Sequence, residues 1–230
     1  MSSFILARGT GECLGQKERQ HVTNEPIPLS LRFSEALRGA ADLHAKQVRK
    51  GTKIPYIAHL LGVASIALHH GADEDEAIAA LLHDAIEDAP AELGANWVPN
   101  WLRFRFGERV LDIVEGCTDA DVKPKPPWRA CKEAYVARIR KEPASVVLVS
   151  AADKLHNAGA ILSDYREIGD ALWHRFNKDA GKAGTVGYYR GLVTAYRATG
   201  HHPRLVRELD AVVMQIEKET GHPGVWPLPR

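Results

Sequence analysis

Apolar side chains recur at steps of three and four residues along most of this chain, as expected of amphipathic helices. The pattern begins at Leu31 and is cleanest near the end, at Leu205, Leu209, Val212, Val213 and Ile216. No Asn-Gly or Asp-Gly turn separates two alternating runs, so nothing indicates a β-hairpin. The sequence therefore predicts an all-α fold of about eight to ten helices.

Helix boundaries are marked by turn-forming and capping residues. Asp73 and Glu76 have the spacing of a capping box, and Gly71 and Gly221 follow apolar stripes in the position of a C-cap. The predicted helices start at Leu31 and otherwise span 59–70, 73–89, 97–116 (as one or two), 128–141, 144–168, 186–198 and 205–220. Loops are predicted at 50–55, 119–127 and 181–187.

Two segments depart from the clear helical pattern of the rest of the chain. Residues 144–168 begin with valines that favour a strand, but the continuation AADKLHNAGAIL favours a helix, and we assign the whole stretch to a helix. Residues 1–28 are polar and aperiodic, which indicates a loose N-terminal leader. The remaining residues, 29–230, are predicted to form one domain.

Composition excludes several classes of protein. The 230 residues carry a formal net charge of +1, which gives no basic excess for a long nucleic acid. No apolar run approaches the length of a membrane span. Three cysteines without a CxxC pair are consistent with the reducing cytoplasm. Eleven histidines in a nearly neutral protein justify a search for a metal or phosphate site.

Ionisable residues gather where the third predicted helix ends. His83 and Glu87 are four residues apart, as are Asp84 and Asp88, so each pair would share a helix face. The preceding residues, 77–82, are all apolar, so these groups would lie in a dry environment. Because a buried charge without a partner is costly, a divalent cation is an attractive partner for them.

Two further residues could complete such a site. His59 opens the preceding helix, and Asp153 interrupts an apolar run. Separately they have simpler explanations: His59 as a helix cap or a core histidine, and Asp153 as the ion-pair partner of Lys154 or Arg166. Together with His83 and Asp84 they make a mixed nitrogen and oxygen set, which suits Mn²⁺, Fe²⁺ or Zn²⁺ better than Ca²⁺.

Five ordered motifs connect these residues to a family. They are HAKQVRK at 44–50, PYIAH at 55–59, LLHDAIED at 81–88, FGERV at 106–110 and ADKLHN at 152–157. This series resembles the HD phosphohydrolase superfamily, and more closely the hydrolase domain of RelA/SpoT homologues, in particular the small alarmone hydrolases that consist of this domain alone. The chain departs from the pattern at Leu60, where the family usually has proline.

The resemblance implies a function and a set of site residues. The metal ligands would be His59, His83, Asp84 and Asp153, usually with Mn²⁺, and Zn²⁺ or Fe²⁺ also suits them. Glu87 and Asp88 would orient or activate the attacking water. The nucleotide contacts would be Arg49, Lys50, Lys125, Asn157 and Tyr188. The implied reaction is hydrolysis of the 3′-pyrophosphate of guanosine tetra- or pentaphosphate, (p)ppGpp, to GDP or GTP and pyrophosphate.

Two alternatives stay open at this point. The same metal site could act on another nucleotide, such as an adenosine alarmone or a phosphorylated dinucleotide. A non-catalytic nucleotide-binding module is disfavoured, because the metal ligands and the Glu87–Asp88 pair are all present. We expect a small-molecule nucleotide as the partner, no long nucleic acid and no membrane. The sequence does not define the native metal, the base, the oligomeric state or any toxin partner.

Overall fold

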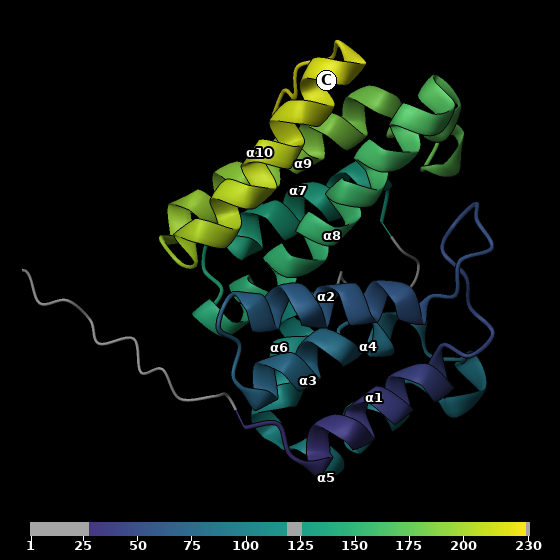
Figure 1. Cartoon of the computed structure of the whole chain (residues 1–230), viewed down its shortest axis with the longest axis vertical. Coiled ribbons are helices and arrows are strands. Elements are labelled where there is room, and N and C mark those ends of the chain that lie inside the picture. Colours follow the sequence, from purple (N-terminus) through teal and green to yellow (C-terminus); the bar gives the residue numbers. More distant parts are fainter. Residues whose placement is uncertain (1–27, 119–125, 229–230) are drawn as a thin grey trace, which may run out of the picture.

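The computed structural model of the chain describes residues 28–118 and 126–228 (Figure 1). The helices, in chain order, are α1 (Leu31–Leu43), α2 (Ile57–His69), α3 (Glu74–Leu82), α4 (Ala85–Asp88), the 3₁₀ helix η1 (Ala91–Leu93), α5 (Trp97–Phe106), α6 (Glu108–Cys117), α7 (Trp128–Ile139), α8 (Ala144–Ile168), the 3₁₀ helix η2 (Gly169–Arg175), α9 (Gly181–Thr199) and α10 (Pro203–Thr220). The predicted all-α fold is confirmed, and the described part of the chain contains no β-strand. Apart from Pro28, the predicted leader lies outside the described residues, so the boundary between leader and domain stays a prediction.

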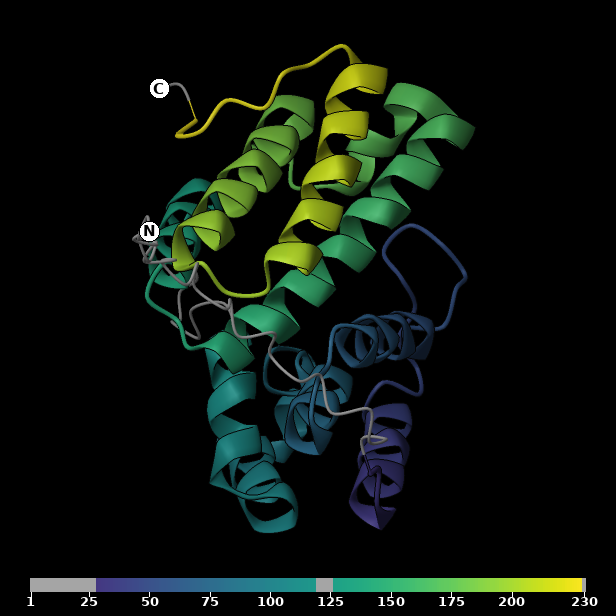
Figure 2. The same cartoon turned by 60° about the vertical axis from the view of Figure 1, so that its left-hand side comes forward.

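The helices form two groups joined by one long helix. Helices α1 to α6 lie in the lower half of Figure 1, and α7, α9 and α10 lie above them with most of α8. Figure 2 shows α8 running from the lower group into the upper one. It packs against α2, α3 and α6 on one side and against α9 and α10 on the other. A residue on α8 can therefore reach groups that the sequence places far away.

Helix α3 is the centre of the lower group. All six residues from Ala77 to Leu82 are buried, with no exposed surface. Its start has the predicted capping box: the Glu76 amide donates to Asp73 Oδ1 at 3.0 Å, and the Asp73 amide donates to Glu76 Oε2 at 2.9 Å. This cap fixes the first turn, so the residues at the far end of α3 have a defined direction.

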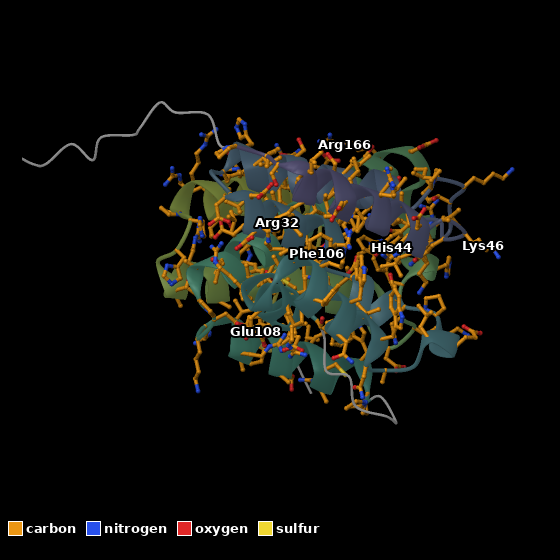
Figure 3. The ribbon with its side chains drawn as sticks, turned by 90° about the horizontal axis from the view of Figure 1, so that it is seen from below. Arg32, His44, Lys46, Phe106, Glu108 and Arg166 are labelled. Atoms are coloured by element: carbon orange, nitrogen blue, oxygen red, sulfur yellow. The ribbon has the colours of Figure 1, made fainter. Side chains whose placement is uncertain are left out.

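Arg32 joins three helices of the lower group. Its guanidinium donates to Asp75 of α3 at 2.8 Å and to the carbonyl of Phe106 at the end of α5 at 2.6 Å (Figure 3). A carbonyl at a helix end lacks a partner within the helix, so this bond also caps α5. No helix in the described ranges is long and apolar enough to cross a bilayer.

Two predicted boundaries are wrong. Residues 181–187 were expected to be a loop, but they are the first turns of α9. The glycines that suggested a turn instead permit close packing, since a Cβ on Gly187 would lie 2.6 Å from the carbonyl oxygen of Val225. The third predicted helix is interrupted: α3 ends at Leu82 and α4 begins at Ala85. The stretch of ambiguous propensity, 144–168, is helical throughout, as predicted.

Candidate metal centre and substrate cavity

Four side chains from three parts of the chain meet at the junction of α2, α3 and α8. His59 Nε2 lies 3.6 Å from Asp84 Oδ2 and 3.3 Å from Asp153 Oδ1. His83 Nε2 lies 3.1 Å from Asp84 Oδ2 and 3.7 Å from Asp153 Oδ1. Ligand atoms of His59, His83 and Asp84 all lie within 4.8 Å of one another, as a shared ion requires. The structure thus brings together all four predicted ligands.

The hydrogen bonds of His83 test whether a cation fits. Its Nδ1 lies 2.9 Å from the carbonyl oxygen of Ala80, so Nδ1 carries the hydrogen. The opposite nitrogen, Nε2, is then a lone-pair donor that is buried and has no hydrogen-bond partner in the described structure. A lone pair that faces two carboxylates is repulsive unless a proton or a cation lies between them. The donor set and its geometry therefore fit a divalent ion.

The hydrogen bond between His83 and Ala80 also explains the break between α3 and α4. The ring of His83 turns back to the carbonyl of Ala80, three residues earlier. That carbonyl belongs to the last turn of α3, whose oxygens lack a full set of partners within the helix. The histidine side chain supplies the missing partner where the helix stops, which directs its other nitrogen toward Asp84 and Asp153.

Electrostatic coupling within this centre is strong. Burial opposes ionisation of Asp84, but when a proton rather than a metal ion occupies His83 Nε2, the charged His83 and a hydrogen bond from His59 outweigh it and lower the pKa of Asp84 far below its usual value; the same carboxylates raise the pKa of His83. Burial likewise opposes the charge of Asp153, yet Lys154 and the two histidines hold its pKa well below normal. Both carboxylates are therefore ionised at neutral pH, which is the form that binds a metal ion.

Neighbouring side chains orient the ligands. The hydroxyl of Tyr56 donates to Asp84 Oδ2 at 2.6 Å, and His59 Nδ1 lies 2.9 Å from His156 Nδ1. Lys154 donates to Asp153 Oδ2 at 2.5 Å. Such contacts fix the rotamers of ligands before an ion arrives. Of the two ion pairs weighed for Asp153, the one with Lys154 is present, whereas Arg166 pairs with Glu219 instead.

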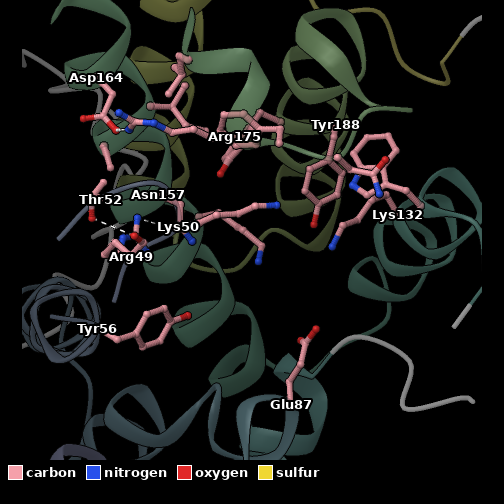
Figure 4. Close-up of a pocket in the computed structure, with 18 of the residues that line it drawn as sticks. Arg49, Lys50, Thr52, Tyr56, Glu87, Lys132, Asn157, Asp164, Arg175 and Tyr188 are labelled. Atoms are coloured by element: carbon pink, nitrogen blue, oxygen red, sulfur yellow. Dashed lines mark hydrogen bonds and ion pairs between the residues drawn. The ribbon is translucent and has the colours of Figure 1, made fainter. Parts of the chain in front are cut away.

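A cavity of about 750 Å³ adjoins the centre (Figure 4). Tyr56, which donates to the candidate ligand Asp84, and Lys154, which donates to the candidate ligand Asp153, both line it. Glu87 points into it from the side opposite Arg175 and Tyr188 (Figure 4). A small molecule in this cavity would therefore lie next to the metal centre.

Most of the predicted substrate contacts line this cavity, namely Arg49, Lys50, Asn157 and Tyr188. Arg49 donates to Asn157 Oδ1 at 2.8 Å, so the loop after α1 is tied to α8 beside Asp153. Lys125 lies outside the described residues. Its role stays a prediction, although its neighbour Pro126 is part of the lining.

The two residues of the acidic pair differ in their surroundings. Glu87 is exposed and lines the cavity, whereas Asp88 is half-buried and accepts a hydrogen bond from Gln47. Burial raises the pKa of Asp88, and nearby Asp84 adds to that rise, while a hydrogen bond from Gln47 at 2.8 Å opposes it. A carboxylate with a raised pKa is better suited to accept a proton than an ordinary one.

Sequence reasoning missed three cationic residues of the lining. Lys154 could have been found, because it follows Asp153 within the ADKLHN motif. Lys132, whose ammonium lies 5.2 Å from the centre of the Tyr188 ring, and Arg175, which pairs with Asp164 at 2.7 Å, had no local signal. Their place in the site depends on how α7 and η2 pack against α8 and α9.

Comparison with known proteins agrees with this geometry. Residues 36–174 match the family described as HD domain, which is more than half of the chain. The chain belongs to the HD-domain family. The matched range contains all four candidate ligands, and it ends before α9 and α10, which complete the upper group of helices.

Proteins with similar sequences have names that refer to hydrolysis of (p)ppGpp. Guanosine-3′,5′-bis(diphosphate) 3′-pyrophosphohydrolase MESH1 of Xenopus tropicalis is 38% identical over 126 residues, which are 54% of this chain and 65% of that protein. The bifunctional (p)ppGpp synthase/hydrolase SpoT of Escherichia coli K12 is 35% identical over 181 residues, 71% of this chain and 24% of SpoT. The chain thus spans less than two thirds of the length of either relative.

Solved structures support the same fold. A metazoan orthologue of SpoT that is described as hydrolysing ppGpp superimposes with a TM-score of 0.65 at 25% identity, covering 83% of this chain and 98% of that one. A Listeria monocytogenes protein superimposes with a TM-score of 0.58 at 24% identity, covering 71% of this chain and 99% of its own, and shows the fold alone.

Proposed function

We propose that this protein hydrolyses the 3′-pyrophosphate of (p)ppGpp and releases GDP or GTP and pyrophosphate. One observation carries the proposal: the buried cluster of two histidines and two aspartates lies beside a cavity lined with cationic side chains. The names of the relatives support the choice of substrate. A phosphorylated nucleotide supplies the negative charge that such a lining attracts.

The four ligands would hold a divalent ion, and we propose Mn²⁺. When bound, the ion polarises a phosphoryl oxygen and lowers the pKa of water. The protein's own residues divide the remaining work. Glu87 and Asp88 orient the attacking water and accept its proton, while Arg49, Lys50 and Lys154 neutralise charge on the phosphates. The bond that breaks joins phosphorus to the 3′ oxygen of the ribose, which leaves as the free hydroxyl after protonation.

The cavity also has apolar and aromatic lining that suits a nucleoside. Its lining includes the side chains of Trp128, Ile161, Leu172, Phe176 and Tyr189. An apolar and aromatic surface beside a cationic one matches a molecule with a flat base at one end and phosphates at the other. We also propose a cytoplasmic location and a small molecule, with neither a long nucleic acid nor a membrane, as the partner.

A nucleotide panel tests this function. Purified protein with Mn²⁺ is incubated with ppGpp, pppGpp and the corresponding adenosine compounds, and the products are identified by chromatography. We expect GDP or GTP together with pyrophosphate in equal amounts. Release of inorganic phosphate instead, or turnover of the adenosine compounds alone, would contradict the proposal.

A further inference from the structure

We infer that Gln47 is a positioning residue that fixes the orientation of Asp88 for catalysis. The inference rests on the proposed function, because it assigns Asp88 to the reacting water. Gln47 lies in the turn between α1 and α2 and is half-buried. Its side-chain amide nitrogen donates to Asp88 Oδ2 at 2.8 Å, across 41 residues of sequence.

The chemistry of the partners gives this contact a fixed polarity. An ionised carboxylate only accepts hydrogen bonds, so the nitrogen of the Gln47 amide must face Asp88 and its oxygen must face away. That oxygen lies 2.7 Å from Nδ1 of His44, which is buried. His44 therefore donates from Nδ1, and the chain His44–Gln47–Asp88 ends on the carboxylate. One oxygen of Asp88 is thereby engaged, and the rotation of the carboxylate is restricted.

The backbone of Gln47 performs a second task. Its carbonyl oxygen accepts a hydrogen bond from the amide of Tyr56 at 3.0 Å. Tyr56 donates its hydroxyl to the ligand Asp84 at 2.6 Å, and its ring stacks on His44 with centroids 5.1 Å apart. Gln47 thus connects to Asp88 through its side chain and to Asp84 through Tyr56.

The same turn presents substrate contacts. Arg49 and Lys50 follow Gln47 and line the cavity. The amide of Arg49 donates to the carbonyl of Ile54 at 2.8 Å, which closes the turn. Gln47 therefore lies at the start of the closed loop that bears Arg49 and Lys50. Its hydrogen bond connects this loop to the carboxylate of Asp88. A misplaced Asp88 should affect the chemical step more than nucleotide binding.

The test compares Gln47→Leu with a matched control. Gln215 on α10 also donates its side-chain nitrogen to a carboxylate, Glu219, at 2.7 Å, and it takes no part in the site. We expect Gln47→Leu to lower kcat by about 10- to 100-fold, as loss of contacts behind a catalytic group does. KM and metal content should stay within about twofold of wild type. Gln215→Leu should leave kcat unchanged.

Two further measurements separate positioning from a structural role. Gln47→Glu places a second carboxylate beside Asp88, so kcat should fall at least as far as in Gln47→Leu. Nitrogen NMR of imidazole should show His44 with its proton on Nδ1 in wild type and a changed signal in Gln47→Leu. This second readout does not depend on turnover.

Defined outcomes overturn the inference. It is wrong if Gln47→Leu keeps wild-type kcat, if it mainly raises KM, or if the His44 signal does not respond to the substitution. Failure of the proposed function looks different: wild type would hydrolyse another nucleotide, and the kcat ratio of Gln47→Leu to wild type on that nucleotide would still test Gln47. A wild type without any hydrolase activity would contradict both.

Discussion

Two clusters of charged side chains in this protein are built on opposite principles. Between α9 and α10, Asp210 accepts from Arg190 and from Arg197, each at 2.6 Å. Arg190 also donates to Glu217 at 2.9 Å. Every charge in this cluster faces an opposite charge that the chain itself supplies, so the cluster is complete and joins two helices.

The centre between α2, α3 and α8 differs. Asp84 and Asp153 face the Nε2 atoms of His59 and His83. The Lys154 ammonium offsets only one of the two carboxylate charges. A complete cluster indicates a structural role, and one that gathers lone pairs indicates a place for a cation. The comparison predicts that mutations in the two clusters have different consequences.

Removal of the metal should have the largest effect, and it should act on the centre between α2, α3 and α8 alone. Chelation followed by dialysis should abolish hydrolysis, because Asp84 and Asp153 would have no ion to share, and Mn²⁺ should restore it. The midpoint of thermal unfolding should rise when Mn²⁺ is added back. Activity assays and calorimetry check both effects. Full activity after complete metal removal would contradict the assignment.

The substitution Asp153→Ala should have the second largest effect. It removes one carboxylate from the centre, so Mn²⁺ content and activity should fall together, and excess Mn²⁺ should rescue activity only in part. If Asp153 served only as the ion-pair partner of Lys154, the folded mutant would lose stability and keep its metal. Metal analysis of the folded fraction decides, and a full complement of metal would refute the ligand role.

Asp210→Ala is the counterpart in the other cluster. It removes the carboxylate that Arg190 and Arg197 share, whereas Arg190 keeps Glu217, so the substitution should cost about 1.5–3 kcal/mol of unfolding free energy. Metal content of the folded protein should not change. Denaturant unfolding with Mn²⁺ present measures the loss. A reduced metal content in the folded mutant would show that the two clusters are coupled, against our comparison.

Among these substitutions, Glu87→Gln and Asp88→Asn should change the stability of the fold least. Their effect should be confined to the chemical step. Both keep shape and remove a charge, so Mn²⁺ and nucleotide should still bind while kcat falls about 10²-fold. Steady-state kinetics with metal analysis separates these quantities. An increase in KM alone would make the affected residue a substrate contact.

Local patterns account for what could be predicted. The capping box at Asp73, the apolar stripes and the spacing within LLHDAIED all involve residues within a few positions of each other, and together with the family resemblance they led to the four candidate metal ligands, which the fold brings together. Long-range packing accounts for the rest. Nothing near Arg175 in the sequence indicates Asp164 or the cavity, and the glycines of α9 resemble a loop until their close neighbours are known.

The close packing on α9 has a consequence for how the shape of the cavity can change. Gly187 and Gly191 admit the C-terminal segment, where Val225 and Trp226 lie, against the helix that bears Tyr188. This segment lies outside the range that matches the family, residues 36–174, yet it supports one wall of the cavity from behind. Substitutions there should reshape the wall that bears Tyr188 and leave the four candidate ligands in place, because those ligands all lie within residues 36–174. One wall of the cavity can therefore vary separately from the candidate metal centre.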